Sequence, residues 1–166
     1  MKYLYLDNLK YDRDELLSLA KSIEDPLWKL WVNPDGRKSP YTQVSYKEIK
    51  NKSPIDAIVN QLNINNDSGK IVILRYSPNT TLKPHTDWIN ACAILIGLTE
   101  NSHIEFWKRK VCETVYYTHP ILANLEVKHS VNNDSDQDRY ILKIPTEESF
   151  RNVSKKLKGL YNDSSM

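Results

Sequence analysis

The N-terminal part of the chain has hydrophobic residues at helical spacing. Between Asp12 and Trp31 they recur every three or four positions, and Pro26 interrupts the pattern, which predicts one helix followed by a turn or a short second helix. The stretch SPIDAIVNQLN predicts another helix, with Ser53 as its candidate N-cap. Between these helices, VNPDGRKSP has the residues typical of a loop, and before them the alternating KYLYL predicts an edge strand.

From Lys70 onward the spacing changes to that of strands. The runs KIVILRY, ACAILIGL, SHIEFW, ETVYYTH and RYILKIP are rich in β-branched and aromatic residues, and polar or proline-containing breaks separate them. With the segment around 82–88 and two runs within 120–131, they predict about eight strands. The tail EESFRNVSKKLKGLYN places its apolar residues on one face and predicts a final helix.

Helices first and consecutive strands afterwards predict an α+β fold. We expect a double-stranded β-helix, a jelly roll of cupin-like form, with N-terminal helices packed on the outside and a C-terminal helix. A chain of 166 residues is long enough for one core and too short for two ordinary domains. We therefore expect a single domain over residues 1–166, with 1–69 as a mainly helical support, 70–146 as the β-helix core and 147–166 as a C-terminal helix and tail.

Composition narrows the class of protein only slightly. A net charge of +2 does not by itself imply a polyanionic partner. No stretch approaches the roughly 18 consecutive apolar residues that a membrane span needs, and the N-terminus lacks the apolar segment of a signal peptide. We expect a cytoplasmic protein without membrane contact. The richness in Asn, Lys, Tyr and Ser is typical of AT-rich genomes, viral ones included.

The segment KPHTDWIN contains the first candidate metal ligands. His85 and Asp87 are one residue apart, so in an extended strand their side chains leave the same face. His129 follows 44 residues later, in the strand-like run LEVKHSV. If a jelly roll brings the two runs together, the three side chains form a two-histidine, one-carboxylate triad that suits non-haem Fe(II) and leaves coordination positions open. Zinc accepts the same ligands, and the alternative for His129 is a structural strand histidine.

Two further residues could hold a co-substrate. Arg139 lies ten positions beyond His129, and a guanidinium directed into a β-barrel could make a paired contact with the carboxylate of a metal-bound dicarboxylate. Tyr76 precedes the first metal pair and could give a hydroxyl to the same ligand. The alternatives are a surface ion pair of Arg139 with Asp136 or Asp138, and a core position for Tyr76.

These residues resemble those of the 2-oxoglutarate- and Fe(II)-dependent oxygenases, whose pattern is H-x-D, then H, then a basic residue about ten places on. The approach RYSPNTTLKPHTD also resembles a run of the AlkB-type dealkylases, with Asn79 where a glycine is usual. The spacing looks closer to aspartyl/asparaginyl β-hydroxylase-like and free proline hydroxylase members. The resemblance covers residues 70–146. It departs from the pattern at Ile141, where some subfamilies have serine or threonine, and at Asp87, because aspartyl β-hydroxylases lack the acidic ligand.

The resemblance implies an enzyme, a dioxygenase that uses Fe(II), 2-oxoglutarate and O₂ to hydroxylate an amino acid or a peptidyl Asp, Asn or Pro side chain. It implies that Arg139 and Tyr76 contact 2-oxoglutarate. No residue beyond the metal ligands is expected to take part directly in the chemistry. The alternatives are an AlkB-like nucleic-acid dealkylase, which is less favoured, and a non-catalytic cupin-type metal-binding module.

Two side chains after the metal pair could line a substrate pocket. Trp88 and Asn90 could offer an aromatic wall and an amide, although core packing suits Trp88 equally well. The basic segment KRKVCE, residues 108–113, is expected to be a solvated face.

Overall fold

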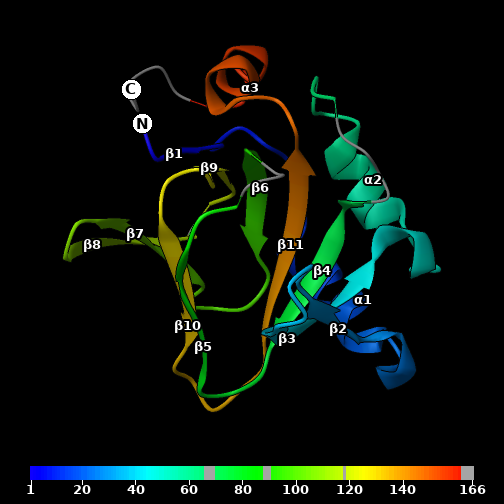
Figure 1. Cartoon of the computed structure of the whole chain (residues 1–166). Coiled ribbons are helices and arrows are strands. Elements are labelled where there is room, and N and C mark those ends of the chain that lie inside the picture. The colour runs from blue at the N-terminus through cyan, green and yellow to red at the C-terminus, as the bar shows by residue number, and fades with distance from the viewer. Residues whose placement is uncertain (66–69, 88–90, 118, 162–166) are drawn as a thin grey trace.

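The structure of the protein is a computed structural model that describes residues 1–65, 70–87, 91–117 and 119–161. Its strands form two antiparallel sheets that face each other (Figure 1). The larger sheet has the order β1-β9-β6-β11-β4-β3-β2 and the smaller sheet the order β5-β10-β7-β8. The strands are β1 Tyr3–Tyr5, β2 Lys29–Val32, β3 Lys38–Ser45, β4 Val72–Tyr76, β5 Thr80–His85, β6 Cys92–Gly97, β7 His103–Lys108, β8 Val111–Tyr116, β9 Ile121–Asn124, β10 His129–Asn133 and β11 Arg139–Thr146.

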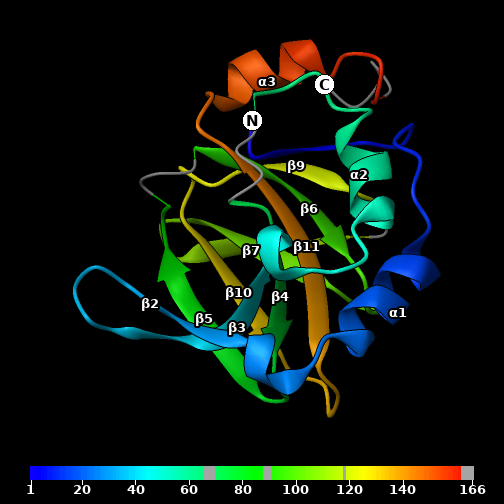
Figure 2. The same cartoon turned by 90° about the vertical axis from the view of Figure 1, so that its right-hand side faces the viewer.

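The helices cover the outer face and one end of the larger sheet (Figures 1 and 2). Their apolar residues share one buried cluster with the outward-facing residues of the central strands. The helices are α1 Arg13–Ser22, α2 Ser53–Val59 and α3 Phe150–Lys156, with short 3-10 turns at Asp25–Leu27 and Tyr46–Glu48. None of the helices among the described residues has the length and apolar composition needed to span a membrane.

Side-chain alternation along the strands produces a second core between the two sheets. On β11, Leu142 and Ile144 belong to the cluster under the helices, whereas Ile141 belongs to the cluster between the sheets. Successive residues of a strand point to opposite faces, so one strand serves both cores. The expected jelly roll with outer helices is confirmed, and its interior lies between the sheets.

The eight strands predicted from residue 70 onward are confirmed as β4 to β11. The helix predicted from Asp12 begins there, with Asp12 as a side-chain cap. The prediction that a turn or helix continues to Trp31 is wrong, because residues 29–32 form β2. The predicted loop over residues 32–40 is also too long, since β3 begins at Lys38 and pairs with β4. Tertiary pairing with β4 overrides the weak local signal of this segment.

Two smaller differences concern local conformation. Ser53 is the first residue of α2 and not its N-cap, which is Lys52. Asn79, which stands where the resembling families have glycine, has a φ of 57°. Asparagine tolerates this left-handed conformation better than other residues with a side chain, so it can replace the glycine in the turn between β4 and β5.

Gly97 allows a close approach between the end of β6 and two later segments, Ser102 just before β7 and Tyr117 just after β8. A Cβ atom there would lie 2.6 Å from Cβ of Ser102 and 3.1 Å from the ring of Tyr117. We expect Gly97→Ala to lower the free energy of unfolding by about 1–3 kcal/mol, because the added methyl group must displace packed atoms. The matched control is Gly159→Ala, where nothing lies within 4 Å of the added Cβ. Urea denaturation checks both variants, and equal stabilities would contradict this packing.

Candidate metal centre

Two histidines stand opposite each other on neighbouring strands. His85 is the last residue of β5 and His129 is the first of β10, and the antiparallel register pairs them directly. Residues paired in this way point to the same face of the sheet. The centroids of the two imidazole rings lie 4.4 Å apart. Strand register therefore joins two side chains that are 44 positions apart in the sequence.

Asp87 completes the cluster from just beyond β5. Its backbone N–H donates to the carbonyl of Leu125 (3.0 Å), which holds this segment beside the chain that follows β9. Its Oδ1 lies 3.4 Å from Nε2 of His85 and 3.9 Å from Nε2 of His129. One ligand atom from each of the three residues lies within 4.8 Å of the others. With metal bonds of about 2.1 Å, neighbouring ligand atoms stand about 3 Å apart, so small side-chain rotations would close the cluster on one ion.

Hydrogen bonds to the backbone set the orientation of both imidazoles. Nδ1 of His85 lies 2.8 Å from the carbonyl oxygen of Lys83, and Nδ1 of His129 lies 2.9 Å from that of Val127. A carbonyl oxygen only accepts, so each Nδ1 carries the proton. The two Nε2 atoms then face Asp87 as potential metal ligands, the arrangement common in metal-binding histidines.

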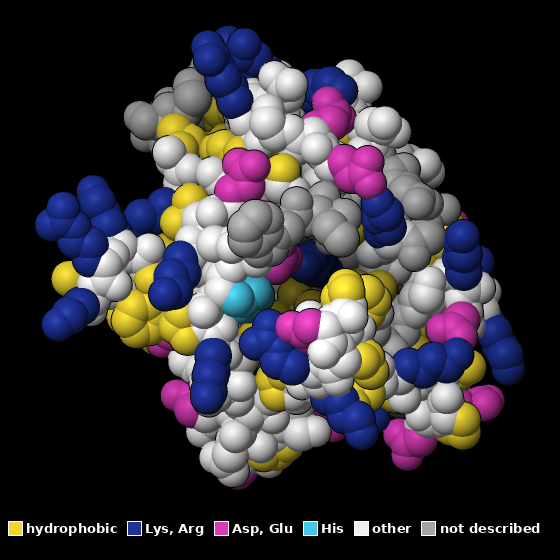
Figure 3. Space-filling model, viewed as in Figure 1, with side chains coloured by type: hydrophobic (Ala, Val, Ile, Leu, Met, Phe, Trp, Pro, Cys, Tyr) yellow, Lys and Arg dark blue, Asp and Glu magenta, His cyan; other side chains and the backbone are white. Residues whose placement is uncertain are grey.

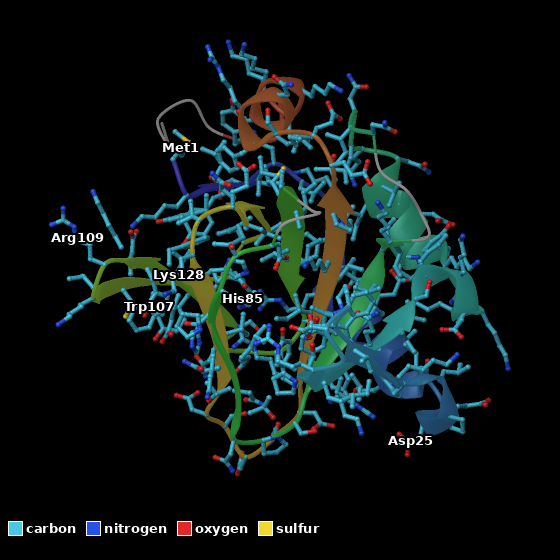
Figure 4. The ribbon with its side chains drawn as sticks, viewed as in Figure 1. Met1, Asp25, His85, Trp107, Arg109 and Lys128 are labelled. Carbon is cyan, nitrogen blue, oxygen red and sulfur yellow. The ribbon has the colours of Figure 1, made fainter. Side chains whose placement is uncertain are left out.

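Lys143 contacts the other oxygen of Asp87. It lies on β11, and its Nζ donates to Oδ2 of Asp87 at 3.1 Å with a side chain that is only 20% exposed. Figure 3 shows a hollow beside a histidine, with acidic and basic side chains at its bottom, and Figure 4 labels His85 at this place in the same view. The two oxygens of the Asp87 carboxylate thus have different partners, since Oδ1 faces the two imidazoles and Oδ2 faces the Lys143 ammonium group.

The surroundings shift the pKa values of all three candidate ligands. Burial lowers the pKa of His129 to about 4. Burial acts in the same direction on His85, but its hydrogen bonds to Asp87 and to the Lys83 carbonyl outweigh it and raise the pKa. Burial alone would raise the pKa of Asp87, yet the hydrogen bond from His85 and the charge of Lys143 hold it well below its usual range. Asp87 is therefore an anion, as a metal ligand must be.

Arg139 is the first residue of β11 and pairs with Tyr76, the last residue of β4. Both side chains are buried, with 4% and 2% exposed. The Nη1 and Nη2 groups of Arg139 donate to the backbone carbonyls of Asn132 and His103. The alternative of a surface ion pair is wrong, because this guanidinium lies inside the fold.

Around Arg139, three buried polar atoms have no hydrogen-bond partner among the described residues. Two are donors, the Nε–H of Arg139 and the hydroxyl of Tyr117, and the third is an acceptor, Oδ1 of Asn132. The Arg139 guanidinium lies 5.8 Å from the centroid of the Tyr117 ring. A buried polar group without a partner costs about 1–3 kcal/mol, so an acceptor that reaches both would be favoured. A carboxylate suits this place, where Nε and the Tyr117 hydroxyl would donate to it, because each terminal nitrogen of Arg139 already donates to a backbone carbonyl.

Tyr76 packs against Tyr41 on β3, with ring centroids 5.1 Å apart. Burial raises the pKa of Tyr76 well above its ordinary value, so its hydroxyl stays protonated and can donate a hydrogen bond. Its predicted contact with 2-oxoglutarate stays a prediction. Trp88 and Asn90 lie outside the described residues, and their predicted place in a substrate pocket stays a prediction as well.

Sequence reasoning missed Lys143 and Tyr117. The position of Lys143 could have been predicted from the sequence, because it lies four residues after Arg139 in a strand and therefore faces the same side. The sequence has no pattern that points to Tyr117, since it stands just beyond β8 and reaches Arg139 only through the packing of the two sheets. Both lie in the interior that the predicted jelly roll required.

The buried, neutral state of His129 predicts a loss of stability in acid when metal is absent. Its pKa falls from about 6.5 in the unfolded chain to about 4 in the fold, so the unfolded state binds more protons between these values and unfolding is favoured as the pH falls. The shift corresponds to about 3 kcal/mol across that window. Urea denaturation with a chelator, from pH 7 down to pH 4, should show a smaller loss for His129→Asn than for the unchanged protein. Equal losses would contradict the assignment.

The sequence model described as aspartyl/asparaginyl beta-hydroxylase matches residues 41–148. The match begins earlier than the resemblance seen over residues 70–146 and takes in most of β3. A search of curated proteins finds no relative of this chain.

Several solved structures share the fold. A prolyl hydroxylase from Trichoplax adhaerens, in complex with a peptide fragment of the hypoxia inducible factor oxygen degradation domain, has a TM-score of 0.64 at 9% identity over 97% of this chain and 88% of that one. A prolyl-4-hydroxylase from Pseudomonas putida has a TM-score of 0.55 at 12% identity over 89% and 93%. A 2OG-Fe(II) oxygenase family oxidoreductase from Burkholderia pseudomallei has 0.52 at 10% over 81% and 78%. With a family match over more than half its length, the chain belongs to the aspartyl/asparaginyl β-hydroxylase family.

Proposed function

We propose that this protein is an Fe(II)- and 2-oxoglutarate-dependent dioxygenase that hydroxylates an amino acid or a peptidyl Asp, Asn or Pro side chain. The observation that carries the proposal is the convergence of two imidazole Nε2 atoms and one carboxylate oxygen inside the fold, from His85, His129 and Asp87. This donor set suits Fe(II) and occupies only three coordination positions. A co-substrate that chelates through two atoms, and then O₂, can take the others.

The position of Arg139 supports 2-oxoglutarate as the co-substrate. Arg139, Ile141 and Lys143 follow each other on the inner face of β11, and Lys143 reaches Asp87. Four residues of strand span about 13 Å, a distance that an arginine side chain and a five-carbon dicarboxylate can bridge together. The unpaired Nε–H of Arg139 and hydroxyl of Tyr117 would donate hydrogen bonds to one carboxylate, and the metal would hold the oxo-acid end.

The protein's own part in the reaction is to orient and to exclude water. His85 and His129 present Nε2 because their Nδ1 protons are held by backbone carbonyls. Lys143 engages Oδ2 of Asp87, which favours binding of a metal through Oδ1 alone and keeps a coordination position free. When bound, iron, 2-oxoglutarate and O₂ would supply an oxidant able to hydroxylate an unactivated carbon.

A polypeptide substrate is favoured over a free amino acid. The β2 strand, at the edge of the larger sheet, exposes three consecutive apolar residues, with Leu30 44%, Trp31 44% and Val32 48% exposed. Hydrophobic side chains also gather at the rim of the hollow beside the histidine in Figure 3. Such a surface suits an extended chain leading to the site. The prolyl hydroxylase with a similar fold holds a peptide fragment.

Two substitutions separate metal binding from co-substrate binding. Asp87→Ala should weaken Mn²⁺ binding by more than the roughly tenfold to hundredfold typical of outer-sphere partners, because it removes a ligand. Arg139→Met should leave Mn²⁺ affinity in place and weaken 2-oxoglutarate binding about tenfold to a hundredfold, as expected for a lost charge-assisted contact. Isothermal titration under anaerobic conditions measures both, with the exposed Arg109→Met as the matched control.

Tyr117→Phe keeps this test informative if Arg139→Met unfolds the protein. The Tyr117 hydroxyl has no partner among the described residues, so its removal should not lower stability. A purely structural Tyr117 would leave 2-oxoglutarate affinity unchanged, whereas a co-substrate contact predicts weaker binding. Unchanged affinity in both variants would refute the proposed co-substrate site.

Turnover identifies the substrate class. Succinate release should depend on O₂, Fe(II) and 2-oxoglutarate, and should rise with peptides that contain Asp, Asn or Pro more than with the free amino acids. Methylated oligonucleotides serve as the comparison, since greater release with them would favour a dealkylase. If nothing raises succinate release and metal binds tightly, the protein is a metal-binding module.

A further inference from the structure

The β7–β8 hairpin carries concentrated positive charge at its tip. Lys108 ends β7, and Arg109 and Lys110 form the turn before β8 begins. All three side chains are exposed, and no ion pair among the described residues involves them. Figures 1 and 4 show the hairpin reaching away from the body of the protein, with Arg109 at its outer end and Lys128 closer to the sheet.

This charge is local and not a property of the whole chain. The net charge of the protein is only +2. When the three tip residues, Lys128 and the nearby Lys2 are set aside, the rest of the sequence is net negative. A cationic site on an otherwise acidic protein selects an anionic partner and orients it toward that site.

The backbone at the tip indicates that the charge has a use beyond folding. Arg109 has a φ of 58°, in the left-handed region. The other described residues with a side chain and a positive φ are Asn79 and Asn101, and asparagine tolerates this region best. An arginine at such a turn position costs free energy that asparagine or glycine would save.

A groove runs beside the hairpin. One hollow of ≈ 500 Å³ is lined by Lys2, Lys108, Arg109, Val111, Cys112 and Glu113. A neighbouring hollow of ≈ 450 Å³ is lined by residues 1–5 and shares Lys2 and Glu113 with the first, so the two are continuous. Its one acidic residue, Glu113, is paired with Lys2 at 2.5 Å.

The β8 strand forms one wall of this groove and is the edge of its sheet. It pairs with β7 on one side and with no other described strand. An edge strand offers unpaired N–H and C=O groups to an extended chain, here along the part of β8 before Tyr116, whose carbonyl already accepts from the Tyr5 hydroxyl. Val111 adds an apolar contact, with 72% of its surface exposed.

We propose that the β7–β8 hairpin and its groove bind an extended, acidic segment of a polypeptide. Main-chain hydrogen bonds to β8 would hold the segment, and Lys108, Arg109 and Lys110 would meet its carboxylates. The proposal rests on the proposed function only in taking that polypeptide to be the substrate. Because Phe106 on β7 pairs with His129, Lys108 lies two residues, or about 7 Å of strand, beyond the level of the candidate metal centre.

A nucleic acid fits this surface less well. Binding of single strands relies on aromatic platforms on which bases stack. The Trp107 ring is only partly exposed, and its Nε1–H donates to Ser130. Tyr116 is 51% exposed, but its ring is engaged with that of His103, with ring centroids 5.5 Å apart. An unpaired strand edge, by contrast, matches a polypeptide backbone.

Binding of a labelled peptide tests the proposal without metal or 2-oxoglutarate, so its outcome is independent of the proposed chemistry. The probe is a fluorescent decapeptide of alternating glutamate and threonine, and fluorescence anisotropy measures its affinity for the full chain. The triple variant Lys108→Gln, Arg109→Asn, Lys110→Gln should bind about tenfold more weakly. The matched control is Arg151→Gln, Lys155→Gln, Lys158→Gln, which removes the same charge from exposed positions in and just after α3 and should bind as the unchanged protein does.

Two further measurements make the proposal specific. Arg109→Asn alone should raise the Tm, because asparagine adopts the left-handed backbone conformation at lower cost than arginine. The same substitution should weaken binding of the acidic peptide. A lysine–threonine decapeptide should not bind. Three results would each overturn the proposal. They are an equal loss of peptide affinity in both triple variants, an unchanged peptide affinity in the hairpin variant, and tighter hairpin-dependent binding of a single-stranded DNA decamer.

Discussion

The direct pairing of His85 with His129 across β5 and β10 is the constraint on which the rest of the candidate centre depends. Because successive strand residues face opposite sides, a slip of one residue in this register would turn one imidazole out of the interior. The register is held from a second side, since His129 also pairs with Phe106 on β7. The register between β5 and β10 shifts by one residue just after the pair of histidines, between His129 and Val131, with the extra residue on β5. The two imidazoles are thus positioned by sheet geometry, and Asp87 is held just beyond β5 by its backbone hydrogen bond to Leu125.

The same geometry brings the charged groups of Asp87 and Lys143 into a largely buried place, where burial makes the ionised form of a side chain less favourable. The Asp87 carboxylate is largely buried, and burial opposes its ionisation. Its two oxygens nevertheless find positive or polar partners, Oδ1 near the imidazoles and Oδ2 at Lys143. Without an ion, the hydrogen bond between His85 and Asp87 supplies part of the compensation and raises the pKa of His85, whereas burial lowers the pKa of His129. The centre is therefore arranged around the arrival of a cation.

The features that follow from strand periodicity could be predicted from the sequence. The eight strands after residue 70, and the convergence of His85, Asp87 and His129, depend on alternation and spacing that are visible along the chain. The strands β2 and β3 were missed because their residues carry weak local signals, and pairing with β4 determines their conformation. The hydrogen bonds of Arg139 to two backbone carbonyls and its approach to Tyr117 could not be predicted, because they arise where separate sheets meet.

Each imidazole at the centre takes its orientation from a backbone carbonyl two residues earlier in the chain. No side chain from elsewhere in the fold is needed to fix the ring. The walls around the centre can consequently diverge during evolution while the metal ligands keep their geometry. New selectivity can then arise by exchange of wall residues alone, with the inorganic chemistry inherited intact.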